Sequence, residues 1–109
     1  MQIPSSRWYP FIPQRRSRRV YDPARTIPPD IIAKLQAACR EFRPFPQARA
    51  VLHKGDCDAI FRGVVGTYGK IKGAGTFIAF IGDMSDNNIQ EKVGYIGEAM
   101  ILEATALGL

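Results

Sequence analysis

The chain has 109 residues, of which 46% are hydrophobic and 23% charged, and its net charge is +5. This composition is typical of one small globular domain and argues against a wholly disordered chain. No apolar run reaches the roughly 18 residues of a membrane helix, and two cysteines with one histidine provide neither a disulfide framework nor a zinc site. We therefore expect a reduced, cytoplasmic protein that uses no metal.

The positive charge is concentrated in the first quarter of the chain. Residues 1–25 contain six arginines and one aspartate, which sum to +5, whereas residues 26–109 contain nine basic and nine acidic groups. Four of the six arginines lie in Arg15-Arg16-Ser17-Arg18-Arg19. The sequence therefore predicts a local basic spot on a neutral domain, and not an extended basic surface.

Residues 1–14 combine three prolines with Trp8, Tyr9 and Phe11. Because prolines at this density are incompatible with a regular helix, we predict an extended N-terminal arm with aromatic anchors. The chain then continues as one unit over residues 15–109. Val20-Tyr21 indicates a short strand, and Asp22-Pro23 indicates a turn.

Apolar residues at helical spacing, Cys39 among them, predict an amphipathic helix of about 13 residues between Pro28 and Pro44. Weak alternation predicts a strand over residues 48–53, and a short helix is expected over residues 56–64. Residues 66–75 form a glycine-rich loop in which Lys70 and Lys72 add positive charge. The uncharged, β-branched and aromatic run at residues 76–81 predicts a central strand.

A long last helix follows, with Asp86 or Asn87 as its N-cap and Gly108 as its C′ glycine. Its expected apolar stripe consists of Ile89, Val93, Ile96, Met100, Ile101, Ala104 and Leu107. Gly94 and Gly97 lie one turn apart and indicate a close approach of another helix. If the protein is a dimer, this face is expected at the interface, and Ile96→Lys or Met100→Lys is expected to dissociate it.

Several residues with reactive side chains fit no catalytic pattern. Cys39 lies on an apolar stripe, and the carboxylates flanking Cys57 disfavour a thiolate there. His53 has no evident partner for catalysis. Glu98 and Glu103 have no spacing that suits an acid/base pair, and they are expected at the surface or at an interface.

The arginine-rich stretch is the strongest chemical signal. Guanidinium groups match phosphate oxygens and stay charged, so this stretch, with Ser17 inside it, suits a dianionic phosphate. A solvated basic segment without a ligand is the plainer interpretation. The loop at residues 66–75 contains no nucleotide-binding motif and is explained as well by a simple connection.

Residues 15–22, followed by Ile27-Pro28 and an amphipathic helix, resemble the opening of nitroreductase-like flavoproteins. Tyr68-Gly69-Lys70-Ile71-Lys72-Gly73-Ala74 before a strand, and the last helix up to Leu109, resemble one branch of them, the TM nitroreductases. The resemblance spans roughly residues 9–109. It implies an α+β fold, a sheet wrapped by helices, of which residues 15–109 would be the N-terminal portion, because family domains are close to twice this length.

The resemblance also implies FMN at the interface of a homodimer, with Arg15, Arg16, Ser17 and Arg19 as the expected cofactor-binding residues. NAD(P)H would reduce FMN, and the flavin would then reduce a small-molecule acceptor such as a nitroaromatic or a quinone. No catalytic side chain is required by this chemistry. The Asn-containing loop that many members have after the first helix is missing from residues 43–49, so the resemblance leaves open whether this loop contacts the flavin.

Two alternatives stay open. The arginine-rich stretch, with Trp8, Tyr9 and Phe11 available for stacking, could belong to a small nucleic-acid or anionic-surface binding module. The neutral charge of residues 26–109 argues against nucleic acid as a partner. The chain could also be a degenerate flavoprotein fold without catalysis.

Overall fold

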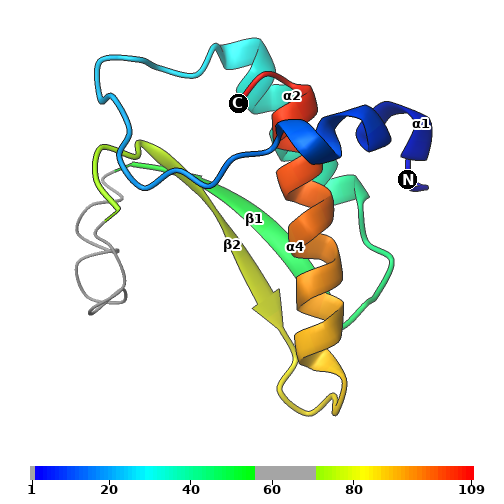
Figure 1. Cartoon of the computed structure of the whole chain (residues 1–109). Coiled ribbons are helices and arrows are strands. Elements are labelled where there is room, and N and C mark those ends of the chain that lie inside the picture. Colours follow the sequence, from blue (N-terminus) through cyan, green and yellow to red (C-terminus); the bar gives the residue numbers. More distant parts are fainter. Residues whose placement is uncertain (1, 56–70) are drawn as a thin grey trace.

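The computed structural model describes residues 2–55 and 71–109. It has an α+β architecture in which helices pack against a two-stranded antiparallel sheet (Figure 1). The elements in chain order are α1 (Ser5–Trp8), the 3₁₀ helix η1 (Tyr9–Gln14), α2 (Pro29–Glu41), β1 (Ala48–Lys54), β2 (Thr76–Gly82) and α4 (Ile89–Ala106). The predicted helix 56–64, Cys57, and residues 66–70 of the glycine-rich loop lie outside the described residues.

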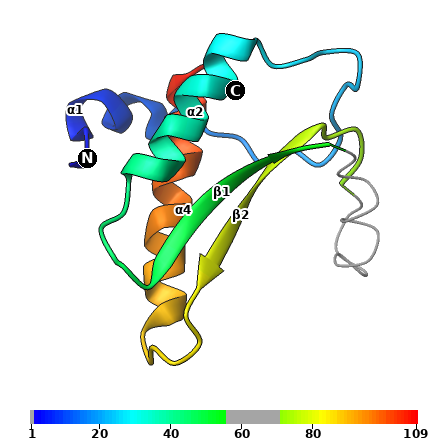
Figure 2. The same ribbon diagram turned by 180° about the vertical axis from the view of Figure 1, so that it is seen from behind.

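The two strands form a regular ladder that runs from Ala48 opposite Gly82 to Lys54 opposite Thr76. Side chains on β1 alternate between buried and exposed as far as Leu52, as expected for a sheet with one covered face. Both α2 and α4 pack on that face (Figure 2). On the opposite face, Val51 and Ile81 are each more than 40% exposed.

The run at residues 76–81 forms a strand as predicted, but it is not central within the described part of the chain. There, β2 pairs with β1 alone, and most of its residues are half-buried. The apolar composition of this run predicted a strand that is covered on both faces. In the described residues, helices cover only one face of β2.

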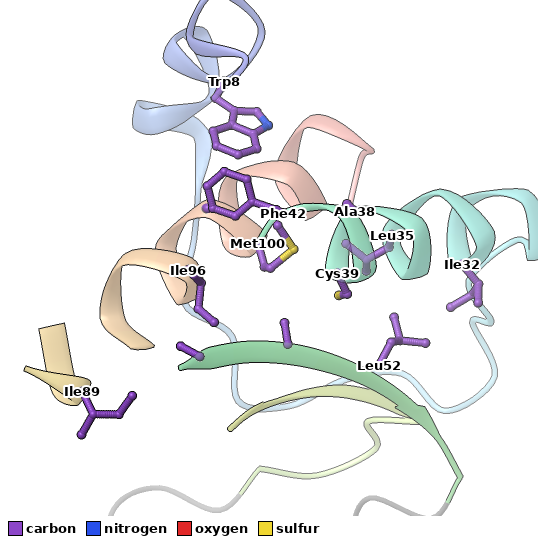
Figure 3. Packing of buried hydrophobic residues seen from close by; sticks show 13 residues of the cluster. Trp8, Ile32, Leu35, Ala38, Cys39, Phe42, Leu52, Ile89, Ile96 and Met100 are labelled. Atoms are coloured by element: carbon purple, nitrogen blue, oxygen red, sulfur yellow. The ribbon is translucent and has the colours of Figure 1, made fainter. Parts of the chain in front are cut away.

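The core lies between the sheet and the two long helices (Figure 3). Helix α2 has the predicted length of 13 residues and buries Ile32, Leu35, Ala38 and Cys39. Helix α4 contributes Ile96 and Met100, which are each 1% exposed. The amphipathic spacing of both segments therefore identified the residues at the centre of the core.

The N-terminal segment is helical, so the prediction of an extended arm is wrong. Proline costs little in these short elements, because Pro4 precedes the first turn of α1 and Pro10 occupies the first turn of η1, where few backbone N–H groups need partners. Among the three expected anchors, Trp8 is buried at 4% exposure, whereas Tyr9 is 75% exposed. Trp8 packs edge-on against Phe42, with ring centroids 5.7 Å apart.

The N-terminal cap of α4 differs from the prediction. The N-cap position is Asn88, and its side chain makes no capping bond. Asp86 acts just before the helix instead, because its carboxylate accepts the backbone N–H of Asn88 at 2.9 Å.

The C-terminal end of α4 follows the prediction. Gly108 has φ +91°, its N–H donates to the carbonyl of Thr105, and the N–H of Leu109 donates to that of Ala104. This is the Schellman arrangement that a C′ glycine permits.

The predicted stripe of α4 needs one correction. Ile101 is 42% exposed, while Ile96 and Met100 point into the core of their own chain. Lysine at either buried position would therefore unfold the chain and would not report on a dimer. A Cβ atom at Gly94 or Gly97 would meet nothing within 4 Å in the described residues, so no helix covers these glycines there.

None of the helices in the described part of the chain is long and apolar enough to cross a membrane.

Candidate functional site: an anchored arginine-rich segment

The arginine-rich stretch follows η1 along the chain and ends beside the loop that precedes β2 (Figure 1). Every residue from 15 to 19 is exposed. At its start, the backbone N–H of Arg15 donates to the carbonyl of Phe11 at 3.1 Å. The guanidinium of Arg16 donates to the carbonyl of Pro13 at 2.7 Å. The stretch therefore begins from a fixed helical turn and presents its side chains to solvent.

At its far end, the stretch pairs with the glycine-rich loop. Val20 and Lys72 form an isolated parallel bridge, in which the N–H of Lys72 donates to Arg19 at 2.9 Å and the N–H of Tyr21 donates to Lys72 at 2.8 Å. The strand predicted at Val20-Tyr21 is reduced to this single bridge. The pairing brings the backbone of Lys72 beside that of Arg19. The positive charge predicted for this loop therefore lies at the end of the arginine-rich stretch.

Gly73 makes this pairing possible. Its φ is +80°, and a Cβ atom built on it would lie 2.1 Å from the carbonyl oxygen of Tyr21. Both the backbone conformation and the close approach therefore require glycine at this position. The loop thus has a structural task beyond connecting two elements.

No carboxylate neutralises the basic stretch within residues 2–55 and 71–109. The two ion pairs found there join Arg7 to Glu103 and Lys92 to Asp86. Asp22, the acid next to the stretch in sequence, accepts the N–H of Ala24 at 2.9 Å. Four exposed guanidiniums that have no carboxylate partner in the described residues, with Ser17 among them, are a donor set that fits a phosphate group such as that of FMN.

The other candidates have structural roles in the described residues. Burial raises the pKa of the Cys39 thiol, which keeps it protonated and unreactive. The exposed His53 ring lies 5.0 Å from that of Phe77. The described residues contain no cluster of three potential metal ligands.

Glu103 is not at the surface, so that prediction is wrong. It is 6% exposed, and it is the one buried charged residue of the described segments. Its carboxylate accepts the indole N–H of Trp8 at 2.7 Å and a guanidinium N–H of Arg7. Sequence spacing could not reveal this site, because both partners lie more than 90 positions away.

A shallow apolar hollow lies at the Gly82 end of β2. Its walls are Phe80, Gly82, Met84, Ile89, Gln90 and Val93. The strand has seven residues, from Thr76 to Gly82, which separates its two ends by about 20 Å. Because Lys72 precedes the opposite end of the strand, the hollow is not part of the basic site.

Comparison with known proteins gives one family match. The family model described as "Putative TM nitroreductase" matches residues 8–109, which include the whole arginine-rich stretch, Lys72 and α4. No curated protein and no solved structure matches the chain.

Proposed function

The chain belongs to this nitroreductase family, and on that premise we propose that it is an FMN-dependent oxidoreductase that uses NAD(P)H to reduce small acceptors such as nitroaromatics or quinones. The observation that supports the cofactor is the exposed, unneutralised stretch from Arg15 to Arg19 inside the matched region. The proposal places the enzyme in the cytoplasm, where a buried free thiol such as Cys39 is the usual state.

Arg15, Arg16, Ser17 and Arg19 would hold the phosphate and ribityl chain of FMN. Each charge-assisted hydrogen bond contributes roughly 1.5–3 kcal/mol, so two or three of them would hold the cofactor firmly. The exposed Lys72 adds a fifth positive charge at this end of the stretch, because the bridge fixes its backbone opposite Val20. FMN, when bound, supplies the redox chemistry. The side chains of this chain then need only to bind and orient it.

An absorption spectrum tests the proposal. We expect the purified chain, after addition of FMN and removal of the excess, to show the visible bands of bound oxidised flavin. Arg15→Ala and Arg19→Ala should weaken binding, whereas Arg40→Ala, a change at an exposed arginine of α2, should not. A folded protein that stays colourless would refute the proposal. Salt-dependent binding of nucleic acid by such a colourless protein would instead favour the nucleic-acid module.

We further propose that the protein is a homodimer that uses the uncovered face of α4. This face contains Gly94 and Gly97, beside which the described residues leave open space, and Ile101, which is 42% exposed. Small residues allow close contact between helix backbones, and exposed apolar side chains favour burial against a partner.

A further inference from the structure

The stretch from Arg15 to Arg19 is attached to the rest of the chain at both ends. One attachment is the bridge between Val20 and Lys72. The other precedes the stretch, where Trp8 is buried against Phe42 and bonded to Glu103. The five residues of the stretch itself are exposed. The position of the guanidiniums therefore depends on the two attachments and not on packing of the stretch itself.

Glu103 lies in an unfavourable place for a carboxylate. It is buried, and it lies in the last turn of α4, where the helix dipole disfavours negative charge. A single oxygen, Oε2, accepts both the indole N–H of Trp8 and a guanidinium N–H of Arg7. Without these donors the buried charge would be uncompensated, so the carboxylate holds both residues against α4.

The element η1 transmits this constraint to the basic stretch. It follows Trp8 directly, and its two prolines restrict the backbone of a six-residue helix. Its last turns accept hydrogen bonds from the Arg15 backbone and from the Arg16 guanidinium. A shift of Trp8 would therefore move Arg15 and Arg16, while the bridge would keep Arg19 in place.

We propose that Glu103 is a positioning residue for the anionic ligand: by holding Arg7 and Trp8 it fixes η1, and so it orients Arg15 and Arg16 before the ligand arrives. The inference rests on the proposed function, in which that ligand is the phosphate of FMN. An ordered site binds more tightly than a loose one, because less conformational freedom is lost on binding.

FMN titrations of the full chain test the inference. Glu103→Gln keeps an acceptor for the indole N–H but removes the negative charge that pairs with Arg7. Arg7→Gln breaks the same ion pair by changing its half-exposed partner. We expect FMN to bind about tenfold more weakly to both variants. Leu52→Ala is the control, since Leu52 lies in the part of the core formed by β1, away from Trp8 (Figure 3). Unchanged FMN affinity in both folded variants would overturn the inference.

Tryptophan fluorescence provides a reading that general loss of stability would not change. Trp8 is the only tryptophan of the chain, so a red-shifted emission in the Glu103 and Arg7 variants would report release of this side chain. The folded Leu52→Ala control should keep the emission of the original chain. Identical emission in all four proteins would contradict the role of Glu103.

Amide hydrogen exchange separates this inference from the proposed function. We expect exchange at the Arg15 N–H to be about tenfold faster in Glu103→Gln and Arg7→Gln, whereas the Lys72 N–H, bonded to Arg19, keeps its rate. If the original chain binds no FMN, the proposed function fails, and exchange still decides the positioning role. Unaltered exchange at Arg15 in both variants would overturn it.

Discussion

The backbone of Gly73 lies so close to Tyr21 that a Cβ atom on the glycine would stand 2.1 Å from the Tyr21 carbonyl oxygen and 2.9 Å from its carbon. This contact belongs to the pairing that joins the basic stretch to the loop before β2. The pairing sets Lys72 beside Arg19, and it therefore depends on a residue without a side chain.

We expect Gly73→Ala to break this pairing. The new methyl group clashes with backbone, which cannot rotate away, and the residue must keep φ +80°. The free energy of unfolding should fall by about 1–3 kcal/mol, and FMN binding should weaken. Urea denaturation and flavin titration measure the two effects. Gly75→Ala is the matched control, because a Cβ atom there meets nothing within 4 Å. Equal losses in the two variants would contradict this account.

Gly82 allows α4 to pass close over the end of β2. A Cβ atom at this position would lie 2.5 Å and 2.7 Å from atoms of Ile89 and 2.9 Å from one of Val93. We expect Gly82→Ala to cost about 1–3 kcal/mol of stability through overpacking. Ile89→Val removes Cδ1, one of the three atoms that the new methyl group would meet, so the double variant should lose less than the sum of the single losses. Simple additivity in urea denaturation would argue against this contact.

The turn before α4 predicts a loss of stability in acid. The hydrogen bond from Lys92, and then the Asn88 N–H, lower the pKa of Asp86 from its ordinary value. The unfolded chain therefore takes up this proton first, and the stabilisation present above the ordinary pKa is lost as the pH falls through the lower, folded value. Below about pH 4, the free energy of unfolding should decline.

This decline should be less steep in Asp86→Asn. A hydrogen bond from the Ser85 side chain likewise lowers the pKa of Asp83, so adding Ser85→Ala should flatten the slope further. Urea denaturation at a series of pH values checks both effects. An acid slope that is the same in all three proteins would exclude these two carboxylates as its source.

The uncovered face of α4 predicts a specific effect on assembly. Ile101 is 42% exposed within one chain, so Ile101→Lys should leave the fold intact and shift a homodimer to monomer. Light scattering gives the mass, and circular dichroism checks the fold. Met84→Lys is the control, since Met84 is 88% exposed on the turn before α4. A dimer that persists in Ile101→Lys would place the interface elsewhere.

Local pattern was sufficient for most of the secondary structure. Periodicity and proline placement located α2, alternation located β1, and the apolar run located β2. The C′ glycine at Gly108 marked the end of α4 correctly, because a Schellman cap is decided by a few adjacent residues. The N-terminal segment failed this logic, since burial of Trp8 stabilises short helices that proline content argues against.

The candidate site was predictable only in part. Charge counting located the stretch from Arg15 to Arg19, because clustering in sequence guarantees clustering in space. The role of Glu103 was not predictable, since its partners Arg7 and Trp8 lie at the other end of the chain. Nor could spacing decide that Ile101 of the expected stripe faces solvent while Met100 is buried.

The sequence alone therefore determined the two long helices, the two strands of the sheet and the place of the excess charge, because periodicity, capping and composition act over a few neighbouring residues. It also identified the family by resemblance, and the match over residues 8–109 confirmed this. Only the tertiary structure decided that Lys72 lies beside Arg19, that Gly73 must have no side chain, and that Glu103 holds the N-terminal helices. These relationships join residues far apart in the chain, and packing of the whole fold, not any local pattern, brings them together.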